Sequence, residues 1–279
     1  RLLASREYGE HWGRHWLDLV RYADTAGDAS DFPVPEMYRY RDYVIRSVQS
    51  DKPFDLFLRE QLAGDILTPA DDEDRREKLI ATSYIANSRR FGQTMGEHYL
   101  TVDDTIDNLS KSLLGLSVGC ARCHDHKFDP IPTKDYYAIS GIFESTKYAH
   151  AGLEHHQYLQ NFHALNPAEN ARLRKTEERM FELHRTVKKG APPMSDDAAK
   201  LLEFYKSSDE FSKLRRDFPN ITMAYGAMEG TPRNSRVLVK GEQSMKGPEA
   251  QRGFLKILGG QQVPDDYKGS GRDLLAGWI

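Results

Sequence analysis

The residues of this chain that are best suited to specific chemistry lie in one short stretch, from Gly119 to Pro130. It contains both cysteines, Cys120 and Cys123, and His124 follows the second cysteine directly. The order Cys-x-x-Cys-His is typical of c-type haem attachment, in which the thiols bond to the haem vinyl groups and the histidine becomes an axial iron ligand. The motif therefore predicts haem c bound covalently through Cys120 and Cys123, with His124 as the metal ligand.

Zinc is an alternative metal for this motif, because thiolates and imidazoles are also zinc ligands. Cys120, Cys123 and His124 would then be joined by His126 or by a histidine elsewhere in the chain. The adjacent Cys123 and His124 argue against such a site, since consecutive side chains point apart and would strain a tetrahedral arrangement. A disulfide, or two free thiols in a scaffold or interaction domain, is the plainer interpretation.

Carboxylates around the motif suggest a third hypothesis, a hydrolase or lyase that acts on glycans. Paired carboxylates can serve as acid and base in such enzymes. The sequence does not fix the separation between these groups, so it assigns no catalytic residue and leaves open whether the protein is an enzyme. The candidate carboxylates are Asp18, Asp24, Asp125 and Asp129.

An electron-transfer role would call for a sixth iron ligand, and the chain offers His15, Met95 and His98 for it. Methionine or histidine in that position favours electron transfer, whereas an open position favours binding or activating a small ligand. The identity of the axial ligands alone moves the potential over ~0.8 V. His11 and His15 also have the i, i+4 spacing of a metal-binding pair on one helix face, but no neighbouring glutamate of the zinc-protease kind accompanies them.

A long helix is expected to deliver the motif. Thr101 and Asp104 resemble an acidic capping box, and the apolar residues after them recur in steps of three and four. The apolar stripe consists of Ile106, Leu109, Leu113 and Leu116, and continues to Cys120. If this helix persists into the motif, both thiols and the imidazole lie on its buried face, because residues three and four apart are neighbours. A haem attached there would be shielded from water.

The other patterns predict a mainly α fold. A first helix over residues 6–24 has helical spacing of its large apolar residues, which predicts that they form the buried face. These residues are Tyr8, Trp12, Trp16, Leu19 and Ala23. After the motif, a proline-rich turn leads into a short helix capped by Thr133 that contains Tyr136 and Tyr137, and ordinary core packing is the default expectation for these aromatic residues.

The later part of the chain divides into two regions. Residues 149–220 are expected to form a linker and an antiparallel helical hairpin, an arm without chemistry of its own. Residues 221–279 are expected to begin a second, truncated domain with a small β-containing piece. In that piece the runs 221–228 and 235–240 should pair as a hairpin. Residues 1–148 would then be a helical domain that carries the Cys-x-x-Cys-His motif.

Composition describes a soluble globular chain of 279 residues, long enough to bury a genuine core without a metal or a disulfide. Its net charge of -3 does not indicate the basic surface that binds nucleic acid. We find no apolar run long enough to cross a bilayer. The chain starts at Arg1 without methionine and stops in an apolar pattern, so we expect an internal fragment, in which a missing signal peptide says nothing about location.

Several stretches, taken together, resemble a family of secreted planctomycete proteins. They are Tyr8–Asp18, Tyr40–Ile45, Gln61–Asp65 and Gly119–Pro130, with a fainter similarity at Arg236–Gly241 and Gly269–Arg272. The family pairs two domains of unknown function and often carries a planctomycete cytochrome c domain upstream.

This resemblance implies an exported, periplasmic or secreted protein that carries a c-type haem motif. It also implies a redox partner protein or the upstream cytochrome c domain as partner, and an association with polysaccharide degradation. His11 stands where the family has arginine, whereas His15 matches the family. That departure weakens a metal pair formed by His11 and His15, and it leaves His15 as the better second-ligand candidate.

Overall fold

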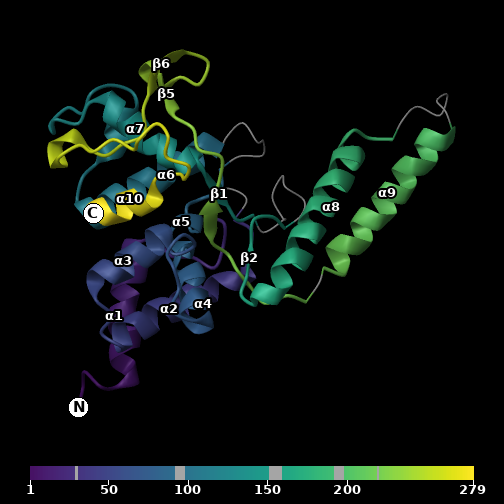
Figure 1. Ribbon diagram of the computed structural model, residues 1–279, viewed down its shortest axis with the longest axis horizontal. Coiled ribbons are helices and arrows are strands. Elements are labelled where there is room, and N and C mark those ends of the chain that lie inside the picture. Colours follow the sequence, from purple (N-terminus) through teal and green to yellow (C-terminus); the bar gives the residue numbers. More distant parts are fainter. Residues whose placement is uncertain (29–30, 92–97, 151–158, 192–197, 219) are drawn as a thin grey trace.

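The computed structural model describes residues 1–28, 31–91, 98–150, 159–191, 198–218 and 220–279. The described chain is mainly α-helical with short strands in small sheets, as the sequence predicts (Figure 1). The helices are α1 (Arg6–Leu19), α2 (Tyr38–Gln49), α3 (Phe54–Ala63), α4 (Asp72–Ala81), α5 (Ser83–Ala86), α6 (His98–Leu109), α7 (Thr133–Glu144), α8 (Asn170–Lys188), α9 (Ala198–Arg216) and α10 (Arg272–Trp278). The strands are β1 (Thr146–Tyr148), β2 (His163–Ala164), β3 (Met223–Ala224), β4 (Ala227–Glu229), β5 (Ser235–Leu238) and β6 (Lys246–Ala250).

Helix α1 packs on α2 through small residues rather than large ones. Gly9 and Gly13 are buried, and a Cβ added to Gly9 would lie 2.8 Å from the backbone oxygen of Ile45 on α2. The predicted buried face is therefore wrong in part, since Trp12 is 51% exposed and Trp16 is only partly buried. The glycines allow the two helix backbones to approach so closely that no bulky side chain fits between them.

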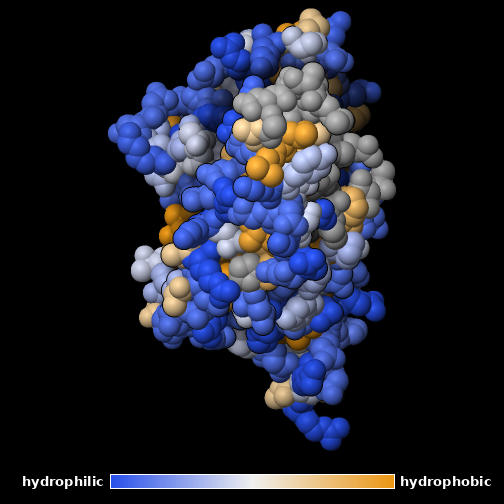
Figure 2. All heavy atoms as spheres, turned by 90° about the vertical axis from the view of Figure 1, so that its right-hand side faces the viewer, coloured by the Kyte–Doolittle hydropathy of each residue, from blue (hydrophilic) through white to orange (hydrophobic). Residues whose placement is uncertain are grey.

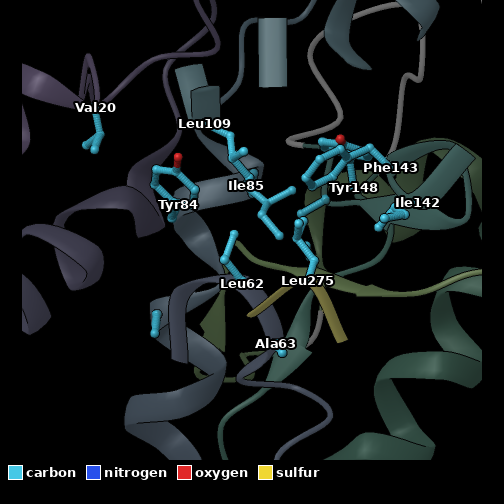
Figure 3. Close-up of a cluster of buried hydrophobic side chains, with 14 of the residues drawn as sticks. Val20, Leu62, Ala63, Tyr84, Ile85, Leu109, Ile142, Phe143, Tyr148 and Leu275 are labelled. Atoms are coloured by element: carbon cyan, nitrogen blue, oxygen red, sulfur yellow. The ribbon is translucent and has the colours of Figure 1, made fainter. Parts of the chain in front are cut away.

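One continuous core joins the first helices to the last. Helix α10 packs on α3, and side chains from α3, α5, α6, α10 and β1 meet in this core (Figure 3). The labelled side chains that meet there include Leu62, Ile85, Leu109, Tyr148 and Leu275. The proposed start of a second domain at residue 221 stays a prediction, but residues 221–279 share one core with residues 1–148.

Within the described residues, the strands form three two-stranded antiparallel sheets, β1–β4, β2–β3 and β5–β6. The predicted hairpin between residues 221–228 and 235–240 is wrong, because β4 pairs with β1 and β5 pairs with β6. Strand β1 directly follows α7 and places Tyr148 opposite Ala227, where both side chains are buried. Burial against the helical core thus decides the pairing of β4 with β1, two strands that are far apart in sequence.

Helices α8 and α9 form the antiparallel arm that the sequence predicts, and Figure 1 shows it projecting away from the helical body. Met180, Leu183 and Phe211 form a separate small core in the arm. The predicted start of its second helix, at Ser195 to Asp197, lies outside the described residues.

Figure 2 shows that the side of the molecule that carries the arm is mainly hydrophilic, with apolar residues in small separate patches. Among the described helices, none combines the length and the apolar character needed to span a membrane.

Candidate functional site

The helix that leads toward the motif begins and ends earlier than expected. Helix α6 already contains Thr101 in its interior, and Asp104 is buried and binds two arginines, so the predicted capping box is wrong. A π-helical turn, Ser110–Leu114, follows α6, and Gly115 ends it in the left-handed region at φ 65°. The apolar stripe therefore does not run on to Cys120 as one helix.

A separate 3-10 helix, Val118–Arg122, carries the first half of the motif. Side chains at i and i+3 eclipse each other in this geometry, because it has three residues per turn. Val118 and Ala121 are buried, whereas Cys120 in the helix and Cys123 directly after it are free and exposed. The predicted burial of the two cysteines is therefore wrong.

His124 is exposed next to the thiols, and its ring orientation is fixed by the backbone. Its Nδ1 lies 2.7 Å from the backbone oxygen of Asp125, which can only accept, so Nδ1 carries the proton and donates. This tautomer leaves the Nε2 lone pair available. Histidines that bind metals commonly donate the other ring N–H to a carbonyl in this way.

His126 has a different, structural role. Its side chain is only 4% exposed. Its Nδ1 accepts hydrogen bonds from the backbone N–H groups of Phe128, at 3.2 Å, and Asp129, at 2.8 Å. The proton therefore lies on Nε2, which donates to the hydroxyl of Ser117 at 3.0 Å. Since both ring nitrogens are engaged, zinc binding by His126 would break the bonds that shape the motif loop, residues 125–132.

The four candidate carboxylates have local partners. The Asp125 carboxylate accepts a hydrogen bond from the backbone N–H of Thr133 at 2.8 Å. Asp125 therefore caps α7, whereas the sequence predicts the Thr133 side chain as the cap. Asp18 lies 3.8 Å from an arginine one turn away on exposed α1, and Asp24 accepts a hydrogen bond from a neighbouring tyrosine hydroxyl. The carboxylate of Asp129 lies 3.4 Å from the His126 ring in the motif loop. None of these contacts joins two of the four carboxylates into a pair that could act as acid and base.

Two buried tyrosines of α7 hold the motif in place. The Tyr137 hydroxyl donates to the backbone oxygen of Arg122 at 2.9 Å, and the Tyr136 hydroxyl donates to Asp103 at 2.7 Å. Asp103 in turn accepts from the Arg122 guanidinium at 2.8 Å. Burial, together with the nearby Asp103 charge, raises the pKa of Tyr136 well above its usual range, so this hydroxyl remains a donor. The default expectation of core packing for these aromatic residues is confirmed.

The turn between β5 and β6 also contacts the motif, and no pattern in the sequence indicates this contact. A Cβ added to Gly241 would lie 2.6 Å from the Cys123 sulfur, and Gly241 has a left-handed φ of 74°. We call residues 239–245 the hairpin turn. Only glycine combines this backbone conformation with such a close approach to the thiol.

A cavity of about 370 Å³ opens next to the motif, between α6, α7 and the β5–β6 hairpin. Its lining includes His98 and the charged residues Arg122, Glu144, Arg233, Arg236 and Lys246. We call it the basic cavity. The hairpin residues were not among the predicted site residues, since nothing in the sequence indicates that the hairpin packs against the motif.

The candidates for a sixth ligand have different positions. His98, at the start of α6, lines the basic cavity together with Arg122, and its ring packs against that of Tyr148. His15 is on the exposed face of α1, where its ring contacts belong to that same helix. Met95 lies outside the described residues. In the part of the chain that is described, no cluster of three or more His, Cys, Asp and Glu side chains is placed to hold a metal ion.

A family described as a protein of unknown function, DUF1549, and named PSCyt2, matches residues 1–148, which is more than half of the chain. The chain belongs to this family. The matched region contains the whole Cys-x-x-Cys-His motif and ends with β1, whereas the hairpin turn and the β5 and β6 residues of the basic cavity come after it. No curated protein and no solved structure matches the chain.

Proposed function

We propose that this chain is an exported c-type haem-binding module with a role in redox chemistry or electron transfer. The observation that carries the proposal is the exposure of Cys120 in the 3-10 helix and of Cys123 directly after it, followed by His124 with its Nε2 available. These groups stand in the order that c-type haem attachment requires. The donor set fits the cofactor, because both cysteines are exposed residues and the imidazole is already oriented by a carbonyl.

The two thiols would hold the cofactor covalently, each S–H group adding across one vinyl double bond so that no group leaves, and the Nε2 of His124 would ligate its iron. When bound, the cofactor would supply a one-electron couple. Of the two described candidates for the sixth position we propose His98, because it lines the cavity next to the motif.

Exposed apolar side chains on the segments that adjoin the motif support the same assignment. Phe128, in the motif loop, is 81% exposed, and Val239 and Met245, in the hairpin turn, are 42% and 49% exposed. Exposed apolar side chains on both segments next to the motif offer surface that an apolar group bound at the motif can cover. Contact with a macrocycle attached at Cys123 would remove these three side chains from water. Each Å² of apolar surface buried in this way contributes about 25 cal/mol of stabilisation.

The finer family assignment belongs to the proposal. We infer a secreted planctomycete protein in which this domain is paired with a second domain of unknown function and associated with polysaccharide degradation. A redox partner protein or an upstream cytochrome c domain would exchange electrons with it. Haem c chemistry and the family resemblance both support a periplasmic or secreted location.

The decisive test is expression in a host that has a c-type haem maturation system, followed by spectra under oxidising and reducing conditions. We expect a Soret band that responds to reduction and that stays with the chain after denaturation. The double variant Cys120→Ala/Cys123→Ala should lose covalent haem. His124→Ala should change the spectrum, whereas the exposed control His11→Ala should change neither attachment nor spectrum.

Two results would overturn the proposal. One is a folded chain that carries no covalent haem after maturation. The other is covalent haem that persists in the double cysteine variant. Stoichiometric zinc in place of haem would favour the structural zinc alternative instead.

A further inference from the structure

The basic cavity has a charge opposite to that of the whole chain. Arg122, Arg233, Arg236 and Lys246 line it with a single carboxylate, Glu144, although the chain has a net charge of -3. Cations concentrated in a concave site raise the local concentration of anions. The cavity is therefore suited to an anionic ligand.

Two of the four cations have carboxylate partners and two do not. The Arg122 guanidinium lies 2.8 Å from Asp103, and that of Arg233 lies 3.3 Å from Glu144. Arg236 donates only to a backbone oxygen, at 3.4 Å, and neither Arg236 nor Lys246 has a carboxylate partner within the described ranges. Two cations of the lining are thus without an ion pair, although Glu249 lies opposite Arg236 in the β5–β6 register, and two cations suit a ligand with two carboxylates.

The walls of the cavity are held in place by packing and hydrogen bonds. On one side, the tyrosines of α7 fix Arg122 and Asp103, as described above. On the other side, the hydroxyl of Ser235 donates to Glu144 at 2.9 Å, and Gly241 packs on Cys123. Cations on a scaffold held in this way need little rearrangement to bind an anion, which favours affinity.

We propose that the basic cavity binds a ligand carrying two carboxylates, with Arg236 and Lys246 as the groups that contact them. Arginine binds a carboxylate through two parallel hydrogen bonds, and lysine contributes a point charge. The carboxylates have two potential sources, the propionates of a haem attached at Cys120 and Cys123 or a soluble polycarboxylate. The first source rests on the proposed function, whereas the second does not.

The test starts with the chain made without haem maturation, titrated calorimetrically with citrate at physiological salt. We expect saturable binding that weakens as salt is added, and no binding of the uncharged triethyl citrate. Arg236→Gln/Lys246→Gln should weaken citrate binding about tenfold or more, equivalent to one lost charge-assisted contact. Both side chains are exposed, so the variant should fold. The control Lys200→Gln/Arg215→Gln makes the same charge change on the arm and should bind as the parent does.

The haem-loaded chain distinguishes the two sources. If haem loading abolishes citrate binding, and Arg236→Gln/Lys246→Gln lowers the midpoint potential, the propionates occupy the cavity. If citrate still binds to the loaded chain, the ligand is soluble. A chain that binds no citrate and shows no such shift in potential overturns the proposal, whether or not haem attaches.

Discussion

Two of the places where residues 221–279 meet residues 1–148 have opposite character. At one, the Arg272 side chain is fully buried and lies 2.8 Å from Asp65 and 3.0 Å from Glu229, which we call the buried ion cluster. At the other, the hairpin turn contacts Cys123, with large parts of Val239 and Met245 exposed to solvent. The same segment therefore closes the fold at one end and shapes an accessible surface at the other. This contrast separates residues that maintain the fold from residues available for binding.

The largest effect should come from breaking the buried ion cluster. Arg272 donates to both oxygens of Asp65 and to the backbone oxygen of Leu62, so Arg272→Met leaves buried acceptors without a donor and a carboxylate without its counter-charge. Removing one partner of a buried pair costs about 3–5 kcal/mol. We expect a loss of this size in the free energy of unfolding, measured by urea denaturation of the whole chain.

The arm provides a matched surface pair for comparison. Arg179 also binds a carboxylate with two hydrogen bonds, to Glu210 at 2.8 and 2.6 Å, but both side chains are nearly half exposed. Solvent screening limits such pairs to below about 1 kcal/mol. Arg179→Met should therefore cost far less than Arg272→Met, and equal losses would show that burial does not distinguish the two pairs.

The contact of the hairpin turn with the motif should have a smaller effect on stability and a clear effect on the thiol. Gly241→Ala places a non-glycine residue at φ 74° and a methyl group against the Cys123 sulfur. The left-handed backbone costs about 1–2 kcal/mol, and the turn must move away from the motif. We expect iodoacetamide to alkylate Cys123 several-fold faster than in the parent, while the rate at Cys120 stays unchanged.

Gly190→Ala is the control for this prediction. Gly190 has a φ of 79° at the end of α8, and a Cβ added there has no atom within 4 Å, so it carries the same backbone cost without a new contact. Its thiol rates should equal those of the parent. If Gly241→Ala leaves the Cys123 rate unchanged as well, the turn does not restrict access to the motif.

The sequence predicts this fold better than it predicts the site. Apolar periodicity identified the helices and the arm, because helix formation depends on neighbours three and four residues away. It failed at the motif, where Gly115 ends the helix and the 3-10 geometry changes which residues share a side. A period of three instead of 3.6 exposes the cysteines that an α-helical stripe would bury.

The buried ion cluster and the rest of the site both depend on contacts between distant residues. Arg272 and Asp65 are 207 positions apart, and no local pattern relates Cys123 to Gly241. The type of each residue was still informative, since a Cys-x-x-Cys-His order indicates chemistry wherever it lies. What the sequence could not indicate is which surface the C-terminal hairpin would cover, and therefore where the basic cavity forms.

The smallest expected effect concerns pH and lies on the buried side of the comparison. His163 lines a second cavity beside Asp65 and Glu229, and its Nε2–H donates to the backbone oxygen of Ala227 at 2.7 Å. Burial lowers the pKa of His163 below its ordinary value of 6.5. The unfolded chain therefore takes up this proton at a higher pH than the folded chain does. The stability contributed by neutral His163 is present above pH 6.5 and is lost as the pH falls toward its folded pKa.

His163→Gln should flatten this acid dependence, because glutamine keeps an N–H donor and does not titrate. One proton changes the slope of the unfolding free energy against pH by at most about 1.4 kcal/mol per pH unit. The difference between the parent and His163→Gln should therefore appear when their unfolding free energies are compared at neutral pH and just below pH 6.5. The exposed control His15→Gln should keep the slope of the parent. Parallel pH curves for the parent and His163→Gln would contradict the prediction. The buried side of the molecule would then owe its acid sensitivity to groups other than His163.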